Sequence, residues 1–212
     1  CPPYILQGLD PETTYDLYIR KQCGPNTFSD NTCGTSITTG CLPPGPSITE
    51  DFDEEIVCST RCERSCTLNG LFYNVYTDDI DWIAYTGATP TLETGPETDV
   101  SGEGNYVYLE SSGSACPAGS QAILRSDCFE FSGGGADSCH LSFHYYMNGF
   151  DVGDLSVAVS ANGGLSWQVI WSASGDQGDR WQRTYLSLGF LPKGATLQIQ
   201  FIADKLGGPL GD

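Results

Sequence analysis

The chain has 212 residues, enough for one large β-domain or for one domain with part of a second. It carries 27 Asp and Glu residues against nine Lys and Arg residues, a formal net charge of −18. Such an acidic surface repels phosphate backbones and anionic membranes, so nucleic acid is not an expected partner, whereas divalent cations and basic proteins are. No apolar run is long enough to cross a bilayer, so we expect no membrane insertion.

The cysteines indicate an oxidising compartment. There are ten, an even number. The tightest group, Cys58, Cys62 and Cys66, does not match the Cys-x-x-Cys spacing of structural zinc sites, so disulfides are favoured over zinc. The protein is therefore expected to be secreted or to lie on a cell surface. No Asn is followed at the second place by Ser or Thr, and this lack of a glycosylation acceptor favours a bacterial exported protein over a eukaryotic ectodomain.

Short strands are predicted in residues 1–40, from apolar and alternating patterns at residues 4–6, 15–20 and 35–39. The motif Leu9-Asp10-Pro11-Glu12-Thr13-Thr14-Tyr15 resembles the tyrosine corner of fibronectin type III domains. Thr38-Thr39-Gly40 resembles the end of that fold. Residues 1–40 are therefore expected to be the C-terminal portion of a fibronectin type III-like β-sandwich.

Two further features complete this part of the chain. Cys23 and Cys33 bracket a loop rich in Gly, Pro and Asn, and we predict a disulfide between them. Prolines stiffen residues 41–46, which are predicted to form a linker to a second domain over residues 47–212.

The second domain begins with acidic residues. On a strand, the spacing of Asp51, Asp53 and Glu55 would place three carboxylates on one face. Such a face has two functional interpretations, cation binding or the acid/base pair of a glycosidase, and the second lacks the expected pair of outer glutamates. Farther on, Trp82 is predicted to pack in the core, while the acids of Asp78-Asp79-Ile80-Asp81 are expected to be exposed rather than close to a metal site.

Residues 94–110 are predicted to form a turn-rich loop followed by a strand. The loop contains the turn-forming residues Gly95, Pro96, Gly102 and Gly104, and alternating aromatic and aliphatic residues follow it. Asp99 lies in the loop with Glu97 and Glu103 close by in sequence. These carboxylates could bind a hard cation at the edge of a sheet, or they could form a solvated acidic turn.

The most regular pattern lies between residues 140 and 201. Strict alternation at residues 141–147, 155–159 and 167–171, with turns at Asn148-Gly149 and Asn162-Gly163-Gly164, predicts antiparallel hairpins, and two more strands follow. No helical period is present. The pattern predicts an all-β protein built as an antiparallel two-sheet β-sandwich. Before it, Cys128 and Cys139 bracket a Gly-rich turn and are predicted to form a disulfide.

Polar and aromatic residues meet in the loop around residues 176–181. Asp176, Asp179, Arg180 and Trp181 combine acid, guanidinium and indole groups, a mixture typical of contacts to sugars or proteins. The competing interpretation is a turn whose Trp packs into the sandwich. His140 and His144 share one face of a predicted strand and are expected to be surface or packing residues, since the His-Glu-x-x-His pattern of zinc proteases is absent.

Four stretches resemble the signature of the MAM domain, an extracellular adhesion-type β-sandwich: TGPETDVSGEGNYVYLES from Thr94, Glu50-Asp51-Phe52-Asp53, CHLSFHYYMNG from Cys139, and residues 167–181. They occur in the family's order. The resemblance implies a jelly-roll-like sandwich over residues 47–212 whose closing strand is absent. It also implies a structural Ca²⁺ held by Asp53, Asp99 and Asp212.

The resemblance further implies an extracellular adhesion or architectural module of a larger protein, which binds an extracellular protein, a glycan or copies of itself. The alternative is a carbohydrate-binding accessory module of a secreted glycosidase or protease, in which Trp167 or Trp181 would lie exposed in a groove. No Gly-x-Ser-x-Gly elbow is present. No catalytic residue is predicted, and we expect the chain not to be an enzyme.

Overall fold

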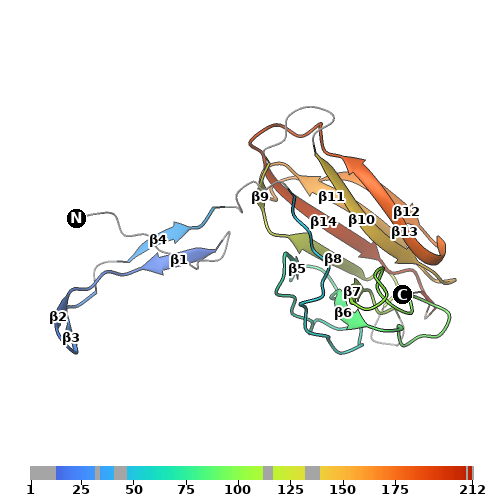
Figure 1. Cartoon of the computed structure of the whole chain (residues 1–212), viewed down its shortest axis with the longest axis horizontal. Helices are drawn as coiled ribbons and strands as arrows, with labels where there is room; N and C mark the ends of the chain where they lie inside the picture. Colours follow the sequence, from blue (N-terminus) through green and yellow to red (C-terminus); the bar gives the residue numbers. More distant parts are fainter. Residues whose placement is uncertain are drawn as a thin grey trace.

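The computed structural model describes residues 13–31, 34–40, 47–111, 117–131, 139–208 and 210–211. All regular secondary structure in these residues is β-strand, and the strands pair antiparallel (Figure 1). The predicted all-β class is therefore confirmed. The predicted strand at residues 4–6, the linker at 41–46, Cys33 and Asp212 lie outside the described residues. Nowhere in the described part of the chain is there a helix that could span a bilayer.

Residues 14–38 form two small antiparallel ladders. Strand β1 (Thr14–Leu17) pairs with β4 (Thr35–Thr38), and β2 (Gln22–Gly24) pairs with β3 (Thr27–Phe28). Cys23 lies at an irregularity in the β2–β3 ladder, and its thiol faces the Lys21 carbonyl at 3.7 Å. Because the Cys23 thiol is free, the predicted Cys23–Cys33 disulfide is not formed.

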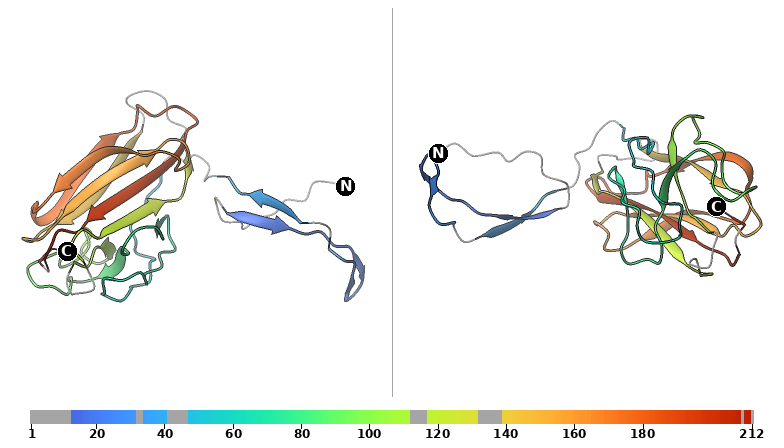
Figure 2. Two further views of the ribbon diagram at one scale, coloured as in Figure 1. Left: turned by 180° about the vertical axis from the view of Figure 1, so that it is seen from behind. Right: turned by 90° about the horizontal axis from the view of Figure 1, so that it is seen from below.

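One layer of the sandwich is a six-stranded sheet in the order β12-β11-β14-β8-β5, with β9 also paired to β14. Figure 2 shows β8 and β14 side by side, in yellow-green and red. The strands are β5 (Phe72–Asn74), β8 (Gln121–Ser126), β9 (Phe129–Glu130), β11 (Asp154–Ser160), β12 (Gln168–Ser174) and β14 (Thr196–Asp204).

The opposite layer contains two ladders. Strand β10 (His140–Met147) pairs with β13 (Gly178–Ser187), and β6 (Ile83–Thr86) pairs with β7 (Asn105–Tyr108). The ring of Phe143 on β10 lies 5.0 Å from that of Phe201 on β14 and 5.2 Å from that of Trp171 on β12, edge to face in both cases. These contacts join the two layers, so the predicted alternation places the apolar residues of β10 between the sheets.

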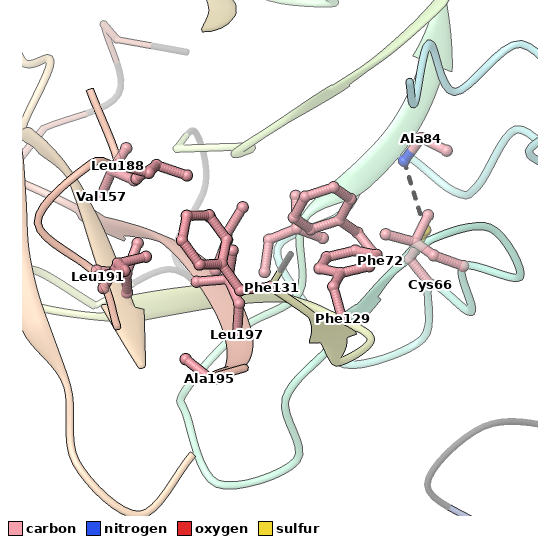
Figure 3. Close-up of a cluster of buried hydrophobic side chains, with 14 residues drawn as sticks. Cys66, Phe72, Ala84, Phe129, Phe131, Val157, Leu188, Leu191, Ala195 and Leu197 are labelled. Carbon is pink, nitrogen blue, oxygen red and sulfur yellow. Dashed lines mark hydrogen bonds between the residues drawn. The ribbon is translucent and has the colours of Figure 1, made fainter. Parts of the chain in front are cut away.

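The main core lies between the layers and contains Phe72, Leu124, Phe129, Phe131 and Val157, all fully or almost fully buried. Figure 3 shows Phe72, Phe129, Phe131 and Val157 gathered in one cluster with neighbouring side chains. At its edge, the amide of Ala84 donates to Sγ of Cys66 at 3.4 Å. The turn predicted at Asn148-Gly149 is also present, and Gly149 has φ +125°, a conformation that suits glycine.

The predicted Cys128–Cys139 disulfide is wrong. Cys128 is fully buried next to β9 and is disulfide-bonded, whereas Cys139 precedes β10 and has a free thiol. The two cysteines are close in sequence, but β9 and β10 belong to opposite layers. A disulfide that the sequence did not resolve joins Cys58 to Cys66, and so closes the loop before β5.

The acids before Trp82 were expected to be exposed, but two of them are buried. Asp78 is 5% exposed and Asp81 is 9% exposed. The amide of Ile123 donates to Oδ2 of Asp78 at 2.6 Å, while Oδ1 has no hydrogen-bond partner. Burial raises the pKa of Asp78 and outweighs this hydrogen bond, and the Asp81 carboxylate adds to the rise. Ionisation of Asp78 therefore destabilises the folded state.

We expect Asp78→Asn to stabilise the protein at neutral pH. The folded-state pKa of Asp78 is raised, so its favourable contribution is complete below the unfolded value of 3.8 and is lost as the pH rises through the folded pKa. The Asn oxygen can still accept from Ile123. Thermal melting at pH 7 should show a rise in Tm of roughly 2 °C that shrinks at acidic pH.

The exposed neighbour Asp79 supplies the control, because Asp79→Asn removes the same charge from the same turn. An equal rise in Tm for both variants would mean that reduced charge repulsion, and not the burial of Asp78, causes the effect.

Candidate functional site

A tight glycine turn and a hydrogen bond from the Thr89 side chain fix the conformation of the loop between β6 and β7. Gly95 has φ +59°, and a Cβ there would approach Oγ1 of Thr89 to 2.5 Å, so only glycine fits the turn. The Thr89 hydroxyl donates to the carbonyl of Thr94 at 2.8 Å. This packing presents residues 96–104 at one corner of the sandwich.

Asp99 organises the second half of this loop. Its carboxylate accepts hydrogen bonds from the amides of Ser101 at 2.9 Å, Gly102 at 2.8 Å and Gly104 at 2.9 Å. Burial alone would raise the pKa of Asp99, but the hydrogen bonds from Ser101, Gly104 and Gly102 outweigh it and lower the pKa to about 2. The carboxylate therefore stays ionised across the physiological pH range.

Asp53 meets Asp99 at Gly104. The amide of Asn105 donates to Oδ1 of Asp53 at 2.8 Å, and a Cβ at Gly104 would collide with that oxygen and lie 2.9 Å from Oδ2 of Asp99. The structure thus brings together two of the three residues predicted to bind calcium, while the third, Asp212, lies outside the described residues. We call Asp53, Asp99 and Gly104 the acidic corner.

The acidic corner has features that suit a hard cation and one that does not. Two carboxylates converge, and Gly104 leaves the space beside them free of a side chain. However, no group of three or more His, Cys, Asp or Glu residues suitable for a metal occurs within the described residues. Backbone amides already supply part of the positive charge that these carboxylates need.

The acids at residues 51–55 do not share one face as predicted. Phe52 has φ +64°, so the segment turns instead of forming a strand. Asp53 faces Asn105, whereas Glu55 is buried and accepts from the amides of Asn69 at 2.9 Å and Gly70 at 2.6 Å. The carboxylates point to different partners, so this segment gives no support to a glycosidase pair.

A groove of about 340 Å³ adjoins the acidic corner, lined by Pro96, Glu97, Thr98, Tyr146, Asp179, Arg180 and Trp181. Nε1 of the half-buried Trp181 donates to the carbonyl of Thr98 at 2.9 Å, which ties β13 to the β6–β7 loop. The Trp181 ring meets Tyr146 edge-on at 5.6 Å. We call this feature the binding groove.

Three of the four predicted contact residues line the binding groove, and the fourth does not. Asp176 instead accepts from the amide of Gly178 at 2.8 Å and shapes the turn before β13. Tyr146, which no sequence motif indicated, also lines the groove, and its hydroxyl donates to Asp179. Burial and this hydrogen bond raise the pKa of Tyr146. The alternation along β10 could have identified Tyr146 as a surface residue, because it is two residues after His144 and so lies on the same outward face.

Comparison with known proteins gives a consistent result. A family model described as "MAM domain, meprin/A5/mu" matches residues 51–212. MAM domain-containing glycosylphosphatidylinositol anchor protein 1 of Rattus norvegicus is 28% identical over 217 residues, which cover 99% of this chain and 19% of the relative. Neuropilin-1a of Danio rerio is 35% identical over 104 residues, which cover 48% of this chain and 11% of the relative. The chain thus spans about a fifth or less of the length of these relatives.

We expect Asp99→Asn to destabilise the sandwich in a pH-dependent way. Because the folded-state pKa of Asp99 is lowered, its stabilising contribution is present above the unfolded value of 3.8 and is lost as the pH falls through about 2. The Asn amide would also place N–H groups against the donors of the loop. Thermal melting should show a fall in Tm of roughly 3–5 °C at pH 7, and the two proteins should converge near pH 2. A gap in Tm that does not change with pH would contradict an ionised Asp99.

Proposed function

Because the chain belongs to the MAM family, we propose that it is an extracellular adhesion or architectural module of a larger secreted or cell-surface protein. The observation that carries the proposal is the binding groove, in which the indole of Trp181 on β13 donates a hydrogen bond to the carbonyl of Thr98 in the β6–β7 loop. Its exposed Arg180 and Asp179 and its aromatic rings suit recognition of a protein surface. We propose no enzymatic activity.

The relatives support an extracellular location. The name of the rat relative states a glycosylphosphatidylinositol anchor, which is a means of holding a protein at a membrane surface. The fibronectin type III-like identity of residues 1–40 stays a prediction, for which the β1–β4 ladder supplies two of the expected strands. The predicted bacterial origin also stays a prediction, and the vertebrate relatives reported above give it no support.

A glycan ligand remains the second candidate for the binding groove. It is favoured by the position of Trp181 beside Asp179 and Arg180 in an open groove. However, Trp181 is half-buried, and Tyr106 and Tyr146 both meet its ring edge-on. A ring held in this way offers less free surface for stacking on a sugar than for contact with a protein side chain, so we place the protein partner first.

We further propose that the acidic corner holds a structural Ca²⁺. Asp53 and Asp99 would supply carboxylate oxygens, and Asp212 would supply a third. The bound ion would neutralise the carboxylates and hold the segment around Asp53 against the β6–β7 loop, so its effect would be on stability and on the shape of the adjoining groove.

Beads coated with the chain are expected to adhere to cells that display the partner, and Arg180→Ala should reduce adhesion roughly tenfold, because an interface Arg is a common hot spot. Arg61→Ala, which removes an exposed Arg elsewhere, is the matched control. Adhesion that is equal for the two variants would contradict a role for the binding groove. Loss of adhesion after glycosidase treatment of the cells would favour the glycan candidate.

Calcium titration by calorimetry, together with melting in calcium and in chelator, tests the cation. A ligand bound only by the folded state stabilises it, by about 2.7 kcal/mol at a hundredfold excess over Kd. We expect Ca²⁺ to raise Tm, and we expect Asp53→Asn to abolish the rise while Glu54→Gln, at the next and also exposed acid, leaves it unchanged. Failure of Ca²⁺ to bind or to shift the melt would remove the cation from the proposal without affecting the adhesion role.

A further inference from the structure

The carboxylates of the binding groove outnumber its cations. Glu97 and Asp179 line the groove, and both are exposed residues. Arg180 is the one cation among the described residues that line it. Within the described part of the chain, the Glu97 carboxylate makes neither a hydrogen bond nor an ion pair with another residue. The groove therefore presents a negative charge that the chain itself does not neutralise.

The hydroxyl of Tyr146 lies where the acids of the groove act together. Burial has the largest effect on the pKa of Tyr146 and raises it, and the hydrogen bond to Asp179 raises it further. The negative charges of Asp179, Glu97 and Asp176 add to this rise. These three carboxylates come from β13, from the β6–β7 loop and from the turn before β13. Segments far apart in the sequence thus create one region of negative potential inside the groove.

The charge balance around the groove favours a cationic partner. Three carboxylates, those of Glu97, Asp176 and Asp179, surround it with a single guanidinium, that of Arg180, so the balance is two negative charges. The adjoining Asp99 carboxylate is also ionised, because its pKa is lowered to about 2. The chain as a whole carries a net charge of −18, so the long-range field has the same sign as the local one. A basic group is therefore attracted both at a distance and at the groove itself.

An Arg side chain matches the groove better than a metal ion does. No group of three or more His, Cys, Asp or Glu residues that could hold a metal occurs in the described residues, those of the groove included. A guanidinium, in contrast, binds carboxylates through charge-assisted hydrogen bonds and packs its planar face against aromatic rings. The groove supplies both kinds of contact, the carboxylates of Glu97 and Asp179 and the rings of Tyr146 and Trp181.

We propose that the binding groove recognises an Arg side chain of the protein partner, which the carboxylates of Glu97 and Asp179 bind. Arg180 at the same groove donates to backbone carbonyls of the partner segment, since a guanidinium has five N–H donors and no acceptor. The inference rests on the proposed function of the groove and adds the chemical class of the group that it binds.

A pair of matched peptides tests this assignment. The 212-residue chain is titrated in excess Ca²⁺ with acetyl-Gly-Gly-Arg-Gly-Gly-amide and with the same peptide carrying citrulline, the neutral analogue of Arg. The indole N–H signal of Trp181 and the amide signal of Thr98 report binding at the groove. We expect the Arg peptide to shift both signals, with a Kd that rises with salt, and the citrulline peptide to bind at least roughly fivefold more weakly. Equal binding of the two peptides would overturn the proposal.

Two variants assign the binding to individual carboxylates. Glu97→Gln and Asp179→Asn should each raise the Kd of the Arg peptide at least roughly threefold, and the Asn oxygen can still accept from Tyr146. The matched control is Glu93→Gln, which removes the same charge from an exposed acid of the same loop outside the groove lining. It should change Kd by less than about 1.5-fold. If Glu93→Gln weakens binding as much as Glu97→Gln, the peptide senses only the overall charge of the chain, and the groove does not recognise Arg.

The cell-adhesion assay separates this inference from the proposed function. We expect the Arg peptide to inhibit adhesion of coated beads, and Glu97→Gln to reduce adhesion while Glu93→Gln does not. Adhesion that Arg180→Ala reduces, but that neither Glu97→Gln nor the Arg peptide affects, would overturn the recognition of Arg and leave the adhesive role of the groove intact. Adhesion that none of these variants affects would overturn both.

Discussion

The packing of Phe143 against Phe201 and Trp171 is the contact on which the rest of the functional surface depends. It holds the β10–β13 ladder on the six-stranded sheet and fixes which face of the ladder is buried. Because side chains alternate along a strand, burying Phe143 forces His144 outward, and the same rule directs Tyr146 toward the groove. The outer surface is thus a consequence of the register of the core.

Backbone amides, rather than Lys or Arg side chains, bind several of the carboxylates of this protein. Few Lys and Arg residues are present, and three carboxylates bind backbone amides instead: Asp99 those of its own loop, Asp53 that of Asn105, and Glu55 those of Asn69 and Gly70. An amide held by a loop cannot move away as a Lys side chain can, so each carboxylate fastens one segment of irregular backbone to another. The loops at the acidic corner are therefore ordered without regular secondary structure.

The acidic corner and the binding groove occupy connected parts of the fold. Thr98, which receives the indole hydrogen bond of Trp181, directly precedes Asp99. A change at the acidic corner can therefore reach Trp181 through a single peptide unit, and Trp181 in turn packs on Tyr146 of the ladder. This continuity gives a physical route by which a cation could affect partner binding.

The alternating residues of β10–β14 and their Gly-containing turns determined the sandwich from the sequence alone, because side-chain period and turn chemistry are local properties. The meeting of Asp53 with Asp99 was expected only from the family resemblance. Tertiary structure decided the features that depend on contacts between segments far apart in the chain. Cys128 and Cys139 are close in sequence but lie next to strands of different sheets, and Asp78 is buried where its carboxylate accepts a hydrogen bond from the Ile123 amide of β8. Which segments meet across the fold depends on long-range packing, and so do disulfide pairing, carboxylate burial and the outline of the groove.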